Sequence, residues 1–210
     1  MDRQDWDARY RAAEPVWGLE PNRWVVRECA GLPPGRALDL AAGEGRNAIW
    51  LAERGWQVTA VDFSAVALER GRTLAAARPP GTADRLTWVT ADVLTHTPDP
   101  AGYDLVLVAY LQVPAADRRA ALRAAAGALA PGGTLLVVGH HSANPAEGVG
   151  GPQDPRVLFT PEDVLADLDG LGLAVDRAER ALRAVAAPDG HGAAGTAIDA
   201  LARLHRPLGG

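Results

Sequence analysis

Short apolar runs alternate with longer segments of helical periodicity along most of the chain. The run at residues 103–109 is nearly continuous in apolar residues, which is typical of a central parallel strand that is covered on both faces. The predicted strands span residues 37–40, 57–62, 86–92, 103–109 and 134–140, and the predicted helices span residues 48–55, 65–77, 114–130 and 161–170. This alternation predicts an α/β fold built on a mostly parallel sheet.

The two ends of the chain follow other patterns. Residues 1–30 hold several aromatic side chains among charges and two Glu-Pro breaks, which predicts a helical cap on a core that spans residues 31–210. Residues 173–185 and 196–204 predict two further strands. In the second of these, Asp199 and Arg203 alternate with apolar positions, so we expect one face to be solvated. We expect residues 1–210 to form a single domain.

Composition restricts the partners of this chain. The net charge of −5 over 210 residues and the scattered arginines provide no broad basic field, so we expect a small-molecule partner and no nucleic acid. The charged start lacks a secretory apolar segment, and no apolar run approaches the roughly 18 residues of a membrane span, so we expect a cytoplasmic protein with no membrane partner. The absence of lysine suggests a GC-rich bacterial genome. The oligomeric state is not indicated.

The segment 36–47 carries the strongest signal for function. A short apolar strand ends in Asp39-Leu-Ala-Ala-Gly-Glu-Gly45, and Arg46-Asn47 open the next helix. A strand, a glycine turn and a helix N-terminus together form a cradle for a nucleotide, and Gly43 to Ala48 formally satisfies the dinucleotide pattern. The carboxylate of Asp39 favours a cofactor with an ammonium group over one with two phosphates, because it would attract the first and repel the second.

The same segment resembles motif I of class I S-adenosylmethionine-dependent methyltransferases, usually D-L-G-C-G-x-G, with Ala41 at the first glycine. Gly45-Arg46-Asn47 and the Trp-Asp-x-Arg-Tyr sequence that ends at Tyr10 look like the tellurite-resistance and thiopurine methyltransferase branch. The resemblance runs from about residue 6 to residue 206, and its specificity lies mostly in residues 36–110. It implies a Rossmann-like, doubly wound, seven-stranded sheet that is mostly parallel and ends in an antiparallel hairpin. S-adenosylmethionine would be the cofactor and S-adenosylhomocysteine the product.

Further cofactor-binding candidates follow the next strands. Asp62 ends the second strand, where a carboxylate accepts hydrogen bonds from ribose hydroxyls, although it could instead cap a helix. Asp92 ends the third strand and could meet the adenine amino group or simply form a turn. Arg46 and Asn47 could hold the methionine carboxylate or cap their helix. The predicted cofactor-binding residues are Asp39, Ala41, Gly43, Gly45, Arg46, Asn47, Asp62, Phe63, Asp92, Val93 and Ala109.

Three residues are candidates for catalysis. Tyr110 follows the fourth strand, beside the position expected for the transferable methyl, and His140 and His141 end the fifth. Neighbours on a strand point to opposite faces, so at most one of the two histidines readily reaches the pocket, where a neutral imidazole could take a proton. No third ligand has metal-site spacing, so no metal is expected. Residues 142–156 form a loop of about lid length.

Aromatic residues in the N-terminal segment are candidates for the acceptor pocket. Tyr10, Trp17 and Trp24 could close over the cofactor, or they could form a packed cap without contact to a ligand. The favoured function is methyl transfer from S-adenosylmethionine to a small-molecule acceptor by in-line displacement. The alternatives are an NAD-type Rossmann oxidoreductase and a non-catalytic module that binds S-adenosylmethionine.

Overall fold

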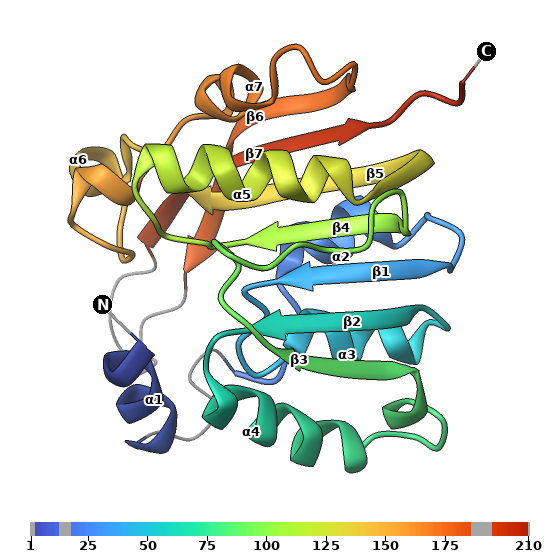
Figure 1. The fold of residues 1–210 in the computed structure, drawn as a ribbon. Helices are drawn as coiled ribbons and strands as arrows, with labels where there is room; N and C mark the ends of the chain where they lie inside the picture. Colours follow the sequence, from blue (N-terminus) through green and yellow to red (C-terminus); the bar gives the residue numbers. More distant parts are fainter. Residues whose placement is uncertain (1–2, 13–17, 186–194, 210) are drawn as a thin grey trace.

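The computed structural model describes residues 3–12, 18–185 and 195–209, and its centre is a seven-stranded sheet of order β3-β2-β1-β4-β5-β7-β6 (Figure 1). The pairs from β3 to β5 are parallel, whereas β7 is antiparallel to both β5 and β6. The predicted fold class, a mostly parallel sheet with a C-terminal antiparallel hairpin, is therefore confirmed. The strands are β1 (Arg36–Leu40), β2 (Gln57–Asp62), β3 (Leu86–Thr90), β4 (Tyr103–Ala109), β5 (Leu129–His140), β6 (Ala174–Val185) and β7 (Gly195–His205).

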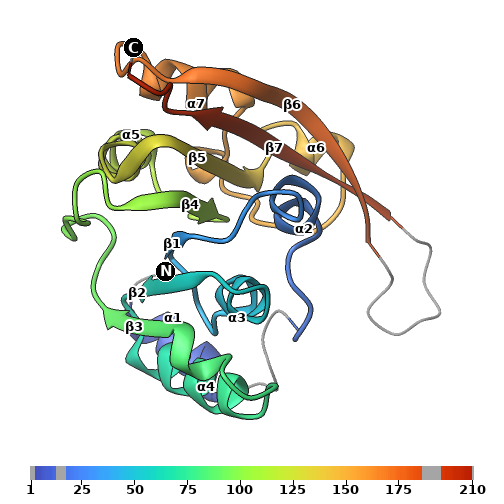
Figure 2. The ribbon, with the colours of Figure 1, turned by 90° about the vertical axis from the view of Figure 1, so that its right-hand side faces the viewer.

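Helices cover both faces of the sheet (Figure 2). The helices are α1 (Arg3–Ala12), α2 (Arg23–Cys29), α3 (Arg46–Glu53), α4 (Ala65–Ala76), α5 (Ala115–Gly127), α6 (Asn144–Glu147) and α7 (Pro161–Leu168), with 3-10 turns η1 (Ala83–Arg85) and η2 (Pro155–Val157). Side chains of α2 and α3 pack with one face of the central strands, and those of α5 and α7 pack with the other. No helix in the described ranges is long and apolar enough to cross a membrane.

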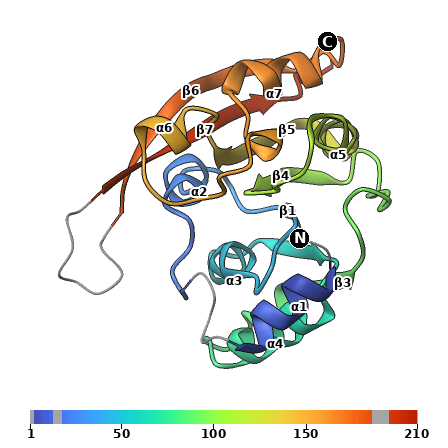
Figure 3. The same cartoon turned by 90° about the vertical axis from the view of Figure 1, so that its left-hand side faces the viewer.

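The strand order reverses between β1 and β4, which pair in parallel at the centre of the sheet. Chain segments that leave the carboxyl ends of two such strands diverge, and the crevice between them is where open α/β sheets bind ligands. In Figure 1 the arrowheads of β1, β2 and β4 point to the edge where α1 and α6 lie. Figure 3 looks onto this edge, with α1 lying over α4. A ligand site is therefore expected at this edge of the sheet.

The expectation that β7 has one solvated face is wrong. Asp199 has an exposed fraction of 0%, and its neighbours along the strand from Ala197 to Ala202 are also buried. β7 lies between β5 and β6 rather than at the sheet edge, and α2 and α7 cover its two faces. The exposed edge strand is β6, where Val175 and Leu182 are exposed.

Residues 142–156 are more structured than a lid-length loop predicts. They contain α6 and the start of η2, and Asn144 has an exposed fraction of 0%. The Asn144 side chain accepts a hydrogen bond from the Ile198 amide at 2.7 Å and donates one to the Gly150 carbonyl at 2.7 Å. Because a buried amide that lost these partners would carry a desolvation cost, Asn144 fastens the segment to β7.

Candidate cofactor-binding and active site

The turn after β1 uses a backbone conformation that favours glycine. Gly43 and Gly45 have φ values of +58° and +75°, and Ala41 has a φ of +59°. Alanine in this left-handed region carries a steric cost of about 1–2 kcal/mol, because its Cβ approaches the following carbonyl oxygen. The alanine at the first glycine of the resembled motif is therefore a strained position rather than only a slightly larger side chain.

Neighbouring aromatic residues occupy the space that these two glycines leave free. A Cβ on Gly43 would lie 2.8 Å from the Tyr10 hydroxyl, and a Cβ on Gly45 would lie 2.4 Å from the Trp88 ring. Tyr10 is buried, and its carbonyl accepts a hydrogen bond from Arg70 of α4. The absent side chain of Gly45 thus lets β3 and the turn pack together, while the absent side chain of Gly43 lets α1 close over the turn.

Asp62 connects the end of β2 to the same turn. Its carboxylate accepts hydrogen bonds from the Gly43 amide and from the Ser64 amide, both at 2.8 Å. Burial raises the pKa of the Asp62 carboxyl, although these backbone donors oppose the rise. A carboxylate has about four acceptor positions, so two such bonds leave capacity for the hydroxyl groups of a ligand.

Asp39 is a buried carboxylate with an unsatisfied acceptor atom. It is 1% exposed, and its Oδ2 atom has no hydrogen-bond partner in the described structure. Burial, followed by the charge of Asp62, raises the pKa of Asp39 to about 7, while Arg46 and a hydrogen bond from the Ala48 amide act in the opposite direction. A buried acceptor atom without a donor is costly. A cationic donor group at this position would remove that cost.

Arg46 and Asn47 begin α3 and have different surroundings. Burial lowers the pKa of Arg46, while the nearby Tyr110 and Asp39 raise it, so the guanidinium is largely buried near both side chains. The Asn47 side-chain oxygen accepts a hydrogen bond from the Asn22 amide at 2.9 Å. This bond fastens the segment before α2 to the start of α3. No side chain caps α3 in the described structure, since its N-cap residue is Gly45.

The residues expected around the adenine lie beside the ends of β2 and β3. Phe63, Asp92 and Val93 are all half-buried, as is Ala109 at the end of β4. The Asp92 carboxylate accepts a hydrogen bond from the Leu94 amide at 2.9 Å, which is the geometry of a turn-forming aspartate. The other Asp92 oxygen makes no side-chain bond that is seen in the described residues, so the turn and a ligand role are compatible.

A cluster around Asp199 was not predicted. The Asp199 carboxylate accepts hydrogen bonds from Trp24 Nε1 at 2.7 Å, Tyr110 Oη at 3.0 Å and Arg183 Nε at 2.7 Å. The sequence did contain one signal, an acid in an otherwise apolar stretch of the last strand. Its meaning depended on whether that strand lay inside the sheet or at its edge, which local periodicity does not reveal.

The aromatic candidates of the N-terminal segment separate in space. The Tyr10 hydroxyl lies at the glycine turn, whereas the Trp24 indole packs in the core beside β5 and points its N–H at Asp199. Trp24 also lines a hollow of about 590 Å³ between α2 and Leu182 of β6. Trp17 lies outside the described residues.

The two histidines point in different directions, as their positions on one strand require. The His140 ring lies 4.9 Å from the Tyr110 ring, and its Nδ1 is 3.7 Å from an Asp199 carboxylate oxygen. His141 Nδ1 instead accepts a hydrogen bond from the Ala143 amide at 3.0 Å, and Arg180, Glu147 and Glu162 surround it. Burial lowers the pKa of both imidazoles. The structure therefore places His140, and not His141, beside Tyr110.

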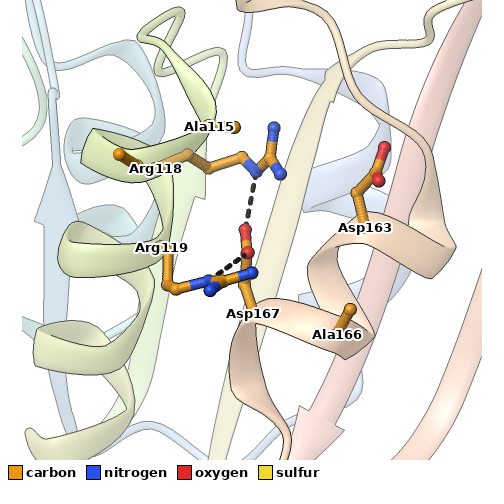
Figure 4. Close-up of a pocket in the computed structure, with 7 residues that line it drawn as sticks. Ala115, Arg118, Arg119, Asp163, Ala166 and Asp167 are labelled. Carbon is orange, nitrogen blue, oxygen red and sulfur yellow. Dashed lines mark hydrogen bonds and ion pairs between the residues drawn. The ribbon is translucent and has the colours of Figure 1, made fainter.

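A separate hollow of about 360 Å³ lies between α5 and α7 (Figure 4). Arg118 and Arg119 both donate to the buried carboxylate of Asp167, at 2.7 and 3.0 Å. The Arg118 guanidinium also lies 5.2 Å from the centre of the Phe159 ring. The Asp167 carboxylate is paired with arginines within the protein. We therefore interpret this hollow as the surroundings of an ion pair between α5 and α7. No group of acids, histidines and cysteines that could hold a metal is present in the described residues.

Comparisons with known proteins find methyltransferases similar to part of this chain. Residues 37–133, just under half of the chain, match a family model described as a methyltransferase domain. An uncharacterized methyltransferase of Mycobacterium tuberculosis is 39% identical over 101 residues, which are 48% of each chain. The tRNA 5-carboxymethoxyuridine methyltransferase of Escherichia coli is 36% identical over 106 residues, 49% of this chain and 39% of that one. The chain thus spans about half the length, or less, of these relatives.

A solved structure shows the same fold over most of the chain. The glycopeptide N-methyltransferase MtfA in complex with S-adenosylmethionine superposes with a TM-score of 0.66 at 23% identity, covering 90% of this chain and 88% of that chain. Together the comparisons show that residues 37–133 are similar to a methyltransferase domain, and that the chain shares the fold of a methyltransferase solved with S-adenosylmethionine. They do not select a branch of methyltransferases, and they do not favour an NAD-type oxidoreductase.

Proposed function

We propose that this protein transfers a methyl group from S-adenosylmethionine to a small-molecule acceptor. The observation that carries the proposal is the buried Asp39 carboxylate, whose Oδ2 lacks a donor at the carboxyl end of β1. An α-ammonium group would supply that donor, and the Arg46 guanidinium beside it would attract an α-carboxylate. A pyrophosphate would instead bring negative charge next to Asp39 and Asp62, so the same acids disfavour a dinucleotide.

The other proposed contacts follow the edge of the sheet. Asp62 would accept hydrogen bonds from the ribose hydroxyls, and Phe63, Asp92 and Val93 would contact the adenine. Ala41, Gly43 and Gly45 would bring the turn against the ligand, and Tyr10 would cover it from α1. Asn47 has its oxygen committed to Asn22, so we propose that its part is to support the turn.

The bound cofactor supplies an electrophilic methyl group on a positively charged sulfur. The protein then has to align an acceptor with that methyl group and exclude water. Ala109 ends β4 at the switch point of the sheet and Tyr110 follows it, so we propose that they lie beside the transferred group. His140 is next to Tyr110 and is the histidine that we propose faces the acceptor.

A small-molecule acceptor fits the charge of the chain. The net charge of −5 gives no broad basic surface for nucleic acid, although one relative is named as a tRNA methyltransferase. Gly45-Arg46-Asn47 and the N-terminal Trp-Asp-x-Arg-Tyr sequence support a place near the tellurite-resistance and thiopurine methyltransferase branch. We also propose a cytoplasmic location, where this cofactor is made and used.

Calorimetric titration with S-adenosylmethionine tests the proposal. Wild type should bind, and Asp39→Asn and Asp62→Asn should each weaken binding by tenfold or more, about 1.4 kcal/mol. Asp104→Asn is the matched control, because Asp104 accepts the Arg36 amide at the opposite end of the sheet and should leave the affinity unchanged. A wild type that binds NAD but not S-adenosylmethionine would overturn the proposal.

A second assay tests turnover and the acceptor class. Release of S-adenosylhomocysteine should depend on an acceptor in a panel of phenols, thiols, amines and chalcogen oxyanions. Turnover with unmodified bulk tRNA, lost at high salt, would replace the small-molecule acceptor with RNA. Binding of the cofactor without turnover on any member of the panel would favour a non-catalytic module.

A further inference from the structure

Asp199 is buried at the centre of a polar cluster that five elements build. It lies on β7, Trp24 lies on α2, Arg183 on β6 and His140 on β5, and Tyr110 follows β4. The Asp199 side chain has an exposed fraction of 0%, so its charge would be very costly without partners. Arg183 supplies the counter-charge, with Nε donating to Oδ2 at 2.7 Å and Nη2 donating to Oδ1 at 3.3 Å.

The two oxygens of this carboxylate have different surroundings. Oδ2 also accepts from Trp24 Nε1 and Tyr110 Oη, whereas Oδ1 faces His140 Nδ1 at 3.7 Å. That distance is slightly too long for a hydrogen bond. Hydrogen bonds of this kind often tighten when a substrate binds, and closing this one requires a movement of about 1 Å or less.

His140 is oriented so that only part of its ring is accessible. Its side chain is 13% exposed, and Nδ1 is buried without a hydrogen-bond partner in the described structure. The backbone at Gly151 packs against the same side of the ring, since a Cβ there would lie 2.7 Å from Nδ1. In the described structure Nε2 makes no hydrogen bond, and it is not fully buried. Nε2 is therefore the nitrogen available at the carboxyl edge of the sheet.

We propose that Asp199 is a positioning residue that orients His140, so that His140 Nε2 accepts the proton of a hydroxyl or amine acceptor. The inference rests on the proposed function. Asp199 favours the tautomer with the proton on Nδ1, which leaves the lone pair on Nε2. Tyr110, held by the same carboxylate, packs against the imidazole with the two ring centres 4.9 Å apart.

The proposed methyl transfer conserves atoms and charge when His140 takes the acceptor proton. The lone pair of the acceptor oxygen or nitrogen forms the bond to the methyl carbon, the methyl–sulfur bond breaks, and its electron pair stays on sulfur. The acceptor proton moves to His140 Nε2, and the imidazolium then faces the carboxylate of Asp199. An acceptor that is already an anion, such as a thiolate or an oxyanion, does not need this base. The cluster therefore selects neutral hydroxyl and amine acceptors within the proposed small-molecule class.

The charges that face His140 define the test. The charged groups are Asp199 from β7 and Arg183 from β6, and the uncharged Tyr110 packs against the ring. Replacing Asp199 removes the favourable charge and leaves Arg183 unpaired, so both changes disfavour the imidazolium. Nuclear magnetic resonance titration of the histidine rings, assigned with His140→Gln, measures this directly without any cofactor or acceptor.

In Asp199→Asn, the pKa of His140 should fall by about one unit. The matched control is Asp176→Asn, since Asp176 pairs with His205 at 2.7 Å on the outer strand. That variant should leave the pKa of His140 unchanged. A folded Asp199→Asn protein in which His140 titrates as in wild type would overturn the proposal, because it would leave Asp199 with a structural role alone.

A second measurement uses wild type alone, so it tests the proposal even if Asp199→Asn does not fold. In wild type, nitrogen chemical shifts should show neutral His140 with its proton on Nδ1, and a proton on Nε2 would overturn the proposal. Calorimetry with S-adenosylmethionine keeps this result separate from the proposed function. Wild type that fails to bind the cofactor removes the proposed function, whereas an Nε2–H tautomer in a protein that binds it removes only the role of Asp199.

Discussion

Asp39 and Asp62 lie near the carboxyl ends of two adjacent parallel strands, and both carboxyl groups are buried at the same edge of the sheet. Burial and then the charge of Asp62 raise the pKa of Asp39 to about 7. An unfolded aspartate titrates near 4, so between these values the folded protein binds more protons than the unfolded chain. Asp39 therefore lowers the stability of the ligand-free protein as pH rises through this window, and its penalty is complete above pH 7.

Asp39→Asn should remove this pH-dependent penalty. Relative to wild type, the variant should gain stability between pH 4 and pH 7 and keep a constant advantage above pH 7, up to about 4 kcal/mol. Urea unfolding of both proteins across this range measures the difference, in which contributions of other titrating groups such as His140 largely cancel. A difference that does not change with pH would show that folding does not raise the pKa of Asp39.

Ala41 and Gly45 have similar positive φ values, +59° and +75°. Exchanging alanine and glycine at these two positions should nevertheless change stability in opposite directions. Ala41→Gly should stabilise the protein by up to about 1 kcal/mol, since the relief of a left-handed Cβ exceeds the additional backbone entropy that glycine loses on folding. Gly45→Ala should destabilise it by more than about 2 kcal/mol, because the new Cβ would lie 2.4 Å from the Trp88 ring. Thermal unfolding measures both changes.

Gly127 provides the control for this pair. It ends α5, and a Cβ there would meet nothing within 4 Å. Gly127→Ala should therefore be neutral or stabilise by up to about 1 kcal/mol. If Gly45→Ala behaved like Gly127→Ala, the packing of Trp88 against the turn would not be the reason for glycine at position 45.

The sequence predicted the parts of this structure that depend on local pattern. The acids at the ends of β1 and β2 could be placed because a parallel strand puts its last residue at the ligand edge, whatever the rest of the fold does. The position of Asp199 could not be predicted, since its burial depends on the insertion of β7 between β5 and β6. The Tyr10 hydroxyl beside Gly43 likewise depends on the docking of α1 onto α4, which joins segments about 60 residues apart.

The strand boundaries show the same limit on a smaller scale. The turn at Pro131-Gly132-Gly133 was expected to precede the fifth strand, but β5 begins at Leu129. The register passes from Leu129 opposite Tyr103 to Thr134 opposite Leu105, so the turn is a bulge inside the strand. Proline and glycine mark an interruption in the sequence, but whether the strand resumes its pairing depends on its partner.

His140 and His141 should differ in their effect on turnover. His140→Gln should reduce the rate with a hydroxyl or amine acceptor by about 10²-fold or more, because the proton loses its acceptor. His141→Gln should change it by less than about threefold, since His141 Nδ1 is bound to the Ala143 amide on the other face of the strand. Release of S-adenosylhomocysteine measures both rates. A larger loss in the His141 variant would reverse the assignment.

Arg118 and Arg119 donate to the same Asp167 carboxylate but should contribute very different amounts to stability (Figure 4). The Arg118 side chain is 7% exposed and that of Asp167 is 3% exposed, whereas that of Arg119 is 62% exposed. Arg118→Ala should cost about 3–5 kcal/mol, because it leaves a buried charge with weaker compensation and removes packing against Phe159. Arg119→Ala should cost less than about 1 kcal/mol, since water screens an exposed pair. Urea unfolding measures both, and cofactor affinity should be unchanged in each variant, because this ion pair lies between helices rather than at the glycine turn.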